Sequence, residues 1–152
     1  MSEDSRQIQV LLEKIGRKLG FKTAHDPEAD SRIYYRDGKI QVGRLDVVWF
    51  TDIPQFGRAY IAAFEVDAKP YTQKKIKGDL FNLRFSRASI CAYVAPFEQL
   101  KDLEEVPRES RTWYKEGRPR ELVQFYAEGL GIAIRILDFK DIREIAANLE
   151  IA

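Results

Sequence analysis

The stretches LDVVWF (residues 45–50) and YIAAFEVD (residues 60–67) decide the fold of this chain. Each is apolar on both alternating faces except where an acid interrupts it, a pattern typical of strands buried on both sides of a sheet. An unpaired carboxylate in such a place is costly or is forced to take up a proton. Proteins tolerate it where a cation, a metal or a chemical role offsets the cost. The two stretches therefore predict both the centre of a sheet and a candidate site.

The spacing of the acids places them together. Side chains at every second position of a strand share one face, so Glu65, Asp67 and Lys69 line up on one side of their strand. Asp46, on a neighbouring strand, is expected to face them. Carboxylate oxygens with a cation nearby suit Mg²⁺ or Mn²⁺. The metal would polarise a phosphoryl oxygen and help to ionise water, and the lysine would stabilise the developing charge.

The segments outside this pair alternate between helix and strand. Apolar spacing predicts helices over residues 5–19, 72–86, 121–128 and 141–149, the last with Asp138 or Asp141 as its N-cap. Strands are predicted over residues 33–35, 40–42, 45–50, 60–66, 90–94 and 132–137, the first two joined by an Asp37-Gly38 turn. Residues 22–31, 51–57 and most of 97–120 are predicted to be loops. This order predicts one α/β domain over residues 1–152, a mixed central sheet with helices on both faces.

Composition restricts the chemistry to carboxylates and lysines. The chain has one cysteine, Cys91, and one histidine, His25, so the usual cysteine and histidine ligands of a structural zinc cluster are missing. His25 lies in a polar stretch and is predicted to be an exposed loop residue. No Gly-rich phosphate-binding loop is present. The polar start and the lack of a long apolar run lead us to expect a cytoplasmic protein with no membrane partner.

The acids and the element order together resemble the PD-(D/E)xK superfamily, which includes restriction endonucleases and archaeal Holliday-junction resolvases. Asp46 matches the first acid of that family and Glu65 the second, and Gln73 to Phe85 matches the helix that follows. The resemblance covers residues 5–95 and implies a restriction endonuclease-like αβββαβ core, to which this chain adds a C-terminal αβα extension. It also implies a Mg²⁺- or Mn²⁺-dependent endodeoxyribonuclease, with metal ligands at Asp46, Glu65 and Asp67.

The chain departs from the family motif at the lysine. The usual lysine stands two residues after the second acid, where this chain has Asp67. Asp67-Ala68-Lys69 is itself a D-x-K, and a slip of two residues keeps every side chain on its face. Lys75 on the next helix is a third candidate for the lysine role. Resolvase-like relatives often place a glutamate on the first helix, where this chain has Gln9, with Glu13 nearby and predicted to be solvated.

Basic residues gather beside the predicted site even though the net charge is only +1. Residues 68–90 carry six basic side chains against one acid, Asp79. A basic helix next to a metal site would suit a phosphate backbone, although lysines on a helix are commonly just solvated. The residues predicted to contact DNA are Lys74, Lys75, Lys77, Arg84 and Arg87.

The sequence leaves three interpretations of the chain open. The chain is either an active nuclease or a module that keeps the nuclease fold and binds DNA or a protein without cutting. A different α/β domain, with Asp46 and Glu65 in structural ion pairs, would be favoured by a sheet order that separates their strands. Many nucleases of this class pair two sites, so a homodimer is one expected arrangement, and the sequence does not decide it.

Overall fold

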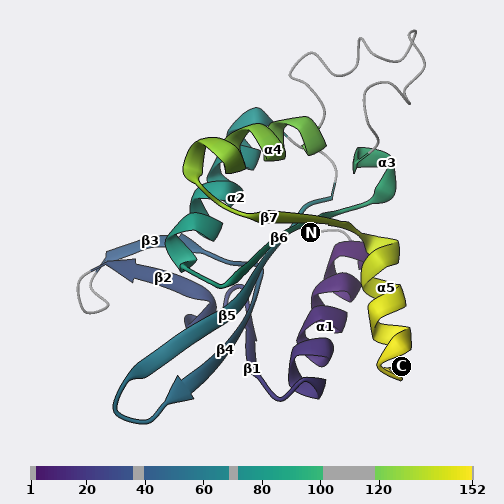
Figure 1. The fold of residues 1–152 in the computed structure, drawn as a ribbon. Helices are drawn as coiled ribbons and strands as arrows, with labels where there is room; N and C mark the ends of the chain where they lie inside the picture. The colour runs from purple at the N-terminus through teal and green to yellow at the C-terminus, as the bar shows by residue number, and fades with distance from the viewer. Residues whose placement is uncertain (1–2, 36–39, 69–71, 101–118, 152) are drawn as a thin grey trace, which may run out of the picture.

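The computed structural model describes residues 3–35, 40–68, 72–100 and 119–151, arranged as a sheet between two layers of helices (Figure 1). The sheet has five strands in the order β1-β4-β5-β6-β7. β1 pairs with β4 and β4 with β5 in antiparallel fashion, whereas β5, β6 and β7 run parallel. The strands span Lys22–His25, Val47–Ile53, Gly57–Val66, Ile90–Ala95 and Ile134–Asp138. The predicted mixed sheet flanked by helices is confirmed.

Alternating strand residues separate the two helical layers. Val47 and Trp49 of β4 pack in one cluster with α1 (Glu3–Lys18) and α5 (Phe139–Asn148). Val48 and Phe50 face the other way, toward Leu83 of α2 (Gln73–Ser86). α4 (Pro119–Leu130) lies beside α2 on that second face, and a short α3 (Phe97–Leu100) follows β6 (Figure 1).

The helix ends follow local rules. The Thr72 hydroxyl accepts a hydrogen bond from the Lys75 backbone N–H, 3.1 Å away, and caps α2. Asp138 caps α5 and forms a reciprocal capping box with Asp141, which decides between the two predicted caps. The first helix was predicted to reach residue 19, but α1 ends at Lys18. Leu19 is 49% exposed and does not pack on the sheet with the apolar residues of α1.

Three sequence predictions of strands and loops need correction. Residues 22–25, predicted as loop, form the edge strand β1, whose residues are mostly polar because only Ala24 is buried. The predicted hairpin exists as β2 (Arg32–Tyr35) and β3 (Ile40–Arg44), but it forms a separate two-stranded sheet. Its predicted turn falls outside the described residues. The predicted loop at 51–57 is also shorter, because β4 and β5 pair out to Ile53 and Gly57.

Gly16 of α1 lies against the ring of Trp49. A Cβ at Gly16 would lie 2.5 Å from two ring atoms of Trp49 and 2.8 Å from Cγ2 of Thr23. The ring cannot move away freely, because its Nε1 donates a 2.8 Å hydrogen bond to the carbonyl of Leu12.

We therefore expect Gly16→Ala to lower the free energy of unfolding by about 1–3 kcal/mol, despite the better helix propensity of alanine. Gly78→Ala on α2, where a Cβ meets nothing within 4 Å, is the matched control. It should leave stability unchanged or raise it by about 0.5–1 kcal/mol in urea unfolding. Equal effects at the two sites would contradict the close approach.

Candidate active site

Two neighbouring strands bring the first two acids together. Asp46 lies directly before β4 and Glu65 near the end of β5, and these strands pair with Val47 opposite Phe64. The carboxyl groups of Asp46 and Glu65 share a hydrogen bond. Asp46 Oδ2 also accepts the backbone N–H of Val66, 2.7 Å away. The wide separation of strands that would have favoured an unrelated α/β domain is therefore not found.

Asp67 follows β5 and anchors a lysine. Its backbone N–H donates a 2.8 Å hydrogen bond to Val94, which extends the β5–β6 pairing. The Asp67 side chain is only 1% exposed. One of its oxygens accepts the Tyr93 hydroxyl at 2.8 Å, and the other forms an ion pair with the ammonium of Lys75 on α2. Lys69, the alternative lysine, lies outside the described residues.

A fourth acid, Asp79, was missed as a site residue in the sequence. It lies on α2, is 9% exposed, and shares a hydrogen bond with Asp67. Its position carried a signal, because Asp79 follows Ile76 by three residues and precedes Leu83 by four. That spacing places it on the apolar stripe of the helix. A carboxylate on the buried side of a helix is as costly as a carboxylate within a buried strand, so both indicate a candidate site.

These side chains border an open cleft of about 690 Å³. Asp46, Glu65 and Asp79 line it on the acidic side, and Lys74 and Lys75 line it from α2. Other elements complete the wall: Ser5 of α1, Arg44 of β3 and Asn82 of α2. The sheet, α1, α2 and the β2–β3 hairpin thus all contribute to one cleft.

Burial controls the protonation of the acids. Burial raises the pKa of Glu65 well above its usual value, and the charges of Asp46 and Asp79 raise it further. Burial also raises the pKa of Asp46, although its hydrogen bond with Glu65 works in the opposite direction. Burial and the hydrogen bond to Asp67 raise the pKa of Asp79 to about 9. Partial burial lowers the pKa of the Lys75 ammonium, but Asp67 outweighs this effect and the pKa is raised.

The donor set of the cleft fits a divalent cation. Glu65 Oε1 and Asp79 Oδ2 are buried and have no hydrogen-bond partner. Acceptor oxygens without donors are the groups that a hard cation satisfies. The acids form two pairs, Asp46 with Glu65 and Asp67 with Asp79. Within the described ranges, no three of these carboxyl groups bring ligand atoms within 4.8 Å of one another. Mg²⁺ typically uses only one or two carboxylates plus water.

The basic residues of α2 are exposed but do not form one surface. Lys74 and Lys75 line the acid cleft. Lys77 lies over the ring of Tyr126 on α4, 5.4 Å from its centroid. Arg84 and Arg87 border a separate hollow of about 270 Å³ at the far end of α2. Only the first pair is adjacent to the acids.

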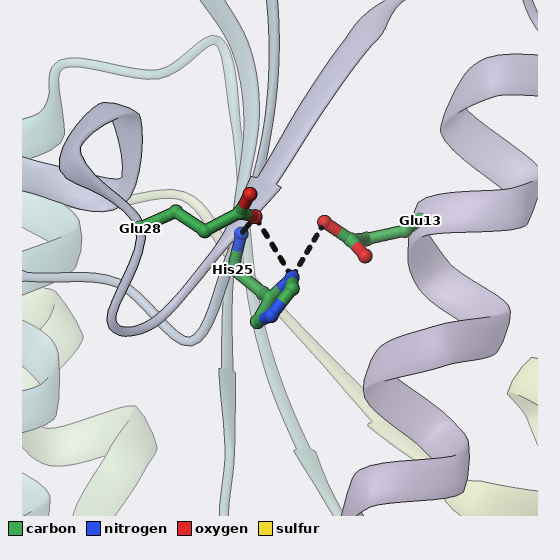
Figure 2. A group of neighbouring side chains, drawn as sticks. All are labelled: Glu13, His25 and Glu28. Atoms are coloured by element: carbon green, nitrogen blue, oxygen red, sulfur yellow. Dashed lines mark hydrogen bonds and ion pairs between the residues drawn. The ribbon is translucent and has the colours of Figure 1, made fainter.

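Two predictions about surface residues were wrong. His25 is not an exposed loop residue: it ends β1 and is half-buried, because its ring packs between two glutamates, Glu13 and Glu28 (Figure 2). The Glu13 side chain, predicted to be solvated, is only 13% exposed. Gln9 is buried at 5% exposure, and its Nε2 has no hydrogen-bond partner.

The raised pKa of Asp79 makes stability depend on pH. Between its ordinary value of 3.8 and about 9, the folded chain holds one more proton at Asp79 than the unfolded chain does. This contribution is fully present below about pH 4 and is lost as the pH rises to about 9, by up to about 1.4 kcal/mol per pH unit.

We expect Asp79→Asn to flatten the fall in unfolding free energy measured by urea titration from pH 5 to pH 9. Asp4→Asn, at an exposed position on α1, is the control and should keep the wild-type slope. An unchanged slope in Asp79→Asn would contradict the protonation of the buried acid.

Comparison with known proteins adds no family. Neither a scan against protein-family models nor a search of curated proteins found a match. In the part of the chain that the structure describes, no helix combines the length and apolar character needed to cross a membrane.

Proposed function

We propose that this protein is a Mg²⁺- or Mn²⁺-dependent endodeoxyribonuclease with a restriction endonuclease-like core. The observation that carries the proposal is the meeting of Asp46, Glu65 and Lys75 at one open cleft. The element order supports the likeness of the core: α1, then β1, β4 and β5, then α2 and β6, with β2 and β3 as an inserted hairpin.

Each side chain has a distinct role in this proposal. Asp46 and Glu65 would hold the metal, which when bound supplies a polarised phosphoryl oxygen and a more acidic water. With an ion in the cleft, Glu65 would be ionised, because a nearby cation favours the charged carboxylate. Lys75 offers its ammonium to the charge that develops on the phosphate. Asp67, with both oxygens engaged, holds Lys75 in position.

The wall of the cleft suits a DNA backbone. Lys74 and Arg44 add positive charge beside the acids, and both are exposed. Arg84 and Arg87 lie apart from this wall, at a separate hollow, and Lys77 is engaged with Tyr126. Such cations bind phosphates without reading sequence. We therefore propose DNA as the substrate class and leave its strandedness and sequence preference to experiment.

A non-catalytic DNA- or protein-binding module with the same core is the second candidate. The observation that favours it is the engagement of Asp67, which leaves two pairs of acids rather than one three-ligand group. In this alternative the acid cluster would bind no divalent ion, and the basic residues would carry the function.

The deciding experiment is cleavage of labelled duplex, single-stranded and four-way-junction DNA with Mg²⁺, with Mn²⁺ and with chelator. Cutting that needs the metal and disappears in Asp46→Asn supports the nuclease. No cutting of any substrate by the folded wild type, together with DNA binding that is independent of metal, would favour the module.

A further inference from the structure

A second group of ligand atoms comes from three residues that do not line the acid cleft. It joins Glu13 of α1, His25 at the end of β1 and Glu28 in the turn before η1 (Ala29–Ser31) (Figure 2). The Nδ1 atom of His25 lies 3.1 Å from Glu13 Oε1 and 2.8 Å from Glu28 Oε1. Each residue offers one ligand atom, and all three atoms lie within 4.8 Å of one another. Three separate segments of the chain thus converge on one point.

Hydrogen bonding alone satisfies this arrangement poorly. An imidazole Nδ1 carries at most one proton, so one N–H faces two carboxylate oxygens. One N–H cannot make two full hydrogen bonds, so a cation between the two carboxylates would satisfy them better. A divalent ion would neutralise both carboxylates and accept the ring nitrogen as a ligand.

Backbone contacts hold the glutamate of the turn in place before any ion binds. The His25 backbone N–H donates to Glu28 Oε1 at 2.9 Å. The Glu28 backbone N–H donates in return to the His25 carbonyl at 2.7 Å. Such outer contacts orient a ligand and strengthen a metal site. Glu13 is held by burial instead, because its side chain on α1 is only 13% exposed.

We propose that Glu13, His25 and Glu28 form a Zn²⁺ site that is independent of the acid cleft. Zinc bonds of about 2.0–2.1 Å to nitrogen and oxygen place tetrahedral ligands roughly 3.3 Å apart. The two nitrogen–oxygen distances need to lengthen by only a few tenths of an ångström to reach that value. One imidazole with two carboxylates suits several first-row ions, and among Mn²⁺, Fe²⁺, Co²⁺, Ni²⁺ and Zn²⁺ such mixed sites usually favour the later ones.

The site has a structural consequence. An ion there would join α1, the edge strand β1 and the turn that leads to η1, three elements linked otherwise by packing and hydrogen bonds. Three protein ligands leave the fourth position to water, and His25 is 42% exposed by side chain, so solvent reaches the site. Because the ion would bind only the folded arrangement, Zn²⁺ should stabilise the chain by mass action.

The test measures Zn²⁺ binding to the full chain by calorimetry, with the visible absorption of bound Co²⁺ as an independent report on the ligands. At this site we expect one ion per chain, counted apart from any ion held in the acid cleft, and, at a hundredfold excess over the dissociation constant, a rise of about 5–10 °C in the thermal midpoint. His25→Ala and the near-isosteric Glu13→Gln should each weaken binding by at least about 10–100-fold. An Asp46→Asn/Glu65→Gln double variant, which lacks the acid-cleft ligands, should keep the ion held by Glu13, His25 and Glu28.

Three outcomes would overturn the proposal. One is the lack of stoichiometric binding to the wild type, which would leave the group as a hydrogen-bonded contact. Another is full binding by folded Glu13→Gln and His25→Ala. The last is loss of binding in the Asp46→Asn/Glu65→Gln variant, which would place the ion in the acid cleft instead.

Discussion

Glu65→Gln is expected to abolish metal-dependent DNA cleavage while stabilising the folded chain at neutral pH. The loss of activity follows from the proposed role of Glu65, because a neutral amide is a much weaker ligand for a hard cation than a carboxylate. We expect a fall in the cleavage rate on the order of 10³-fold or more.

The gain in stability comes from the same burial that makes Glu65 useful. Glu65 is 3% exposed, and burial raises its pKa well above the usual value. A carboxyl group with a raised pKa costs the folded chain free energy at neutral pH relative to the unfolded chain, in which it ionises freely. Glutamine is neutral in both states and can still donate a hydrogen bond to Asp46. We expect the free energy of unfolding to rise at pH 7.

Single-turnover cleavage and urea unfolding of the same preparation check both parts. Glu144→Gln, at an exposed position on α5, is the matched control and should change neither quantity. A Glu65→Gln protein that cuts DNA at the wild-type rate would remove Glu65 from the catalytic machinery. One that is less stable at pH 7 would mean that the buried acid contributes to folding.

Lys75→Met is expected to reduce cleavage by about 10²–10³-fold, the usual cost of losing one group that stabilises charge in a transition state. Lys75 forms an ion pair with Asp67, a buried acid of the cluster. Its side chain remains 47% exposed at the cleft, so its ammonium can reach a bound phosphate. Methionine keeps most of the length of the side chain and removes the ammonium, and with it the ion pair to Asp67.

Variants at three lysines decide which residue takes the lysine role of the family motif. Lys69→Met tests the D-x-K alternative, and Lys140→Met on α5, across the sheet from α2, is the control for loss of a surface charge. Cleavage rates should fall in Lys75→Met, recover in part in Lys75→Arg and stay unchanged in Lys140→Met. A loss confined to Lys69→Met would return the role to Lys69 and make Lys75 an ion-pair partner of Asp67.

Part of the site could be predicted from sequence because burial and charge are in conflict there. Asp46, Glu65 and Asp67 each interrupt or directly follow an apolar strand, and that pattern is visible in a linear chain. Asp79 carried an equivalent signal on the stripe of α2, but a helix shows it less clearly, since its apolar residues are three and four positions apart. The pairing of His25 with Glu13 carried no local signal, because the two residues are twelve positions apart.

The sequence by itself determined the types of most elements, since apolar periodicity and capping residues act over a few residues. It therefore predicted the two central strands, the helix and the strand that follow them, and the mixed sheet between helices. Only the tertiary structure decided that polar residues 22–25 form the edge strand and that the hairpin at 32–44 stands apart from the sheet. An edge strand needs only one buried face and takes its hydrogen bonds from a distant partner, β4, so its own composition does not reveal it. The same reason applies to the pairs Asp67–Lys75 and His25–Glu13, which exist because packing brings separate elements together.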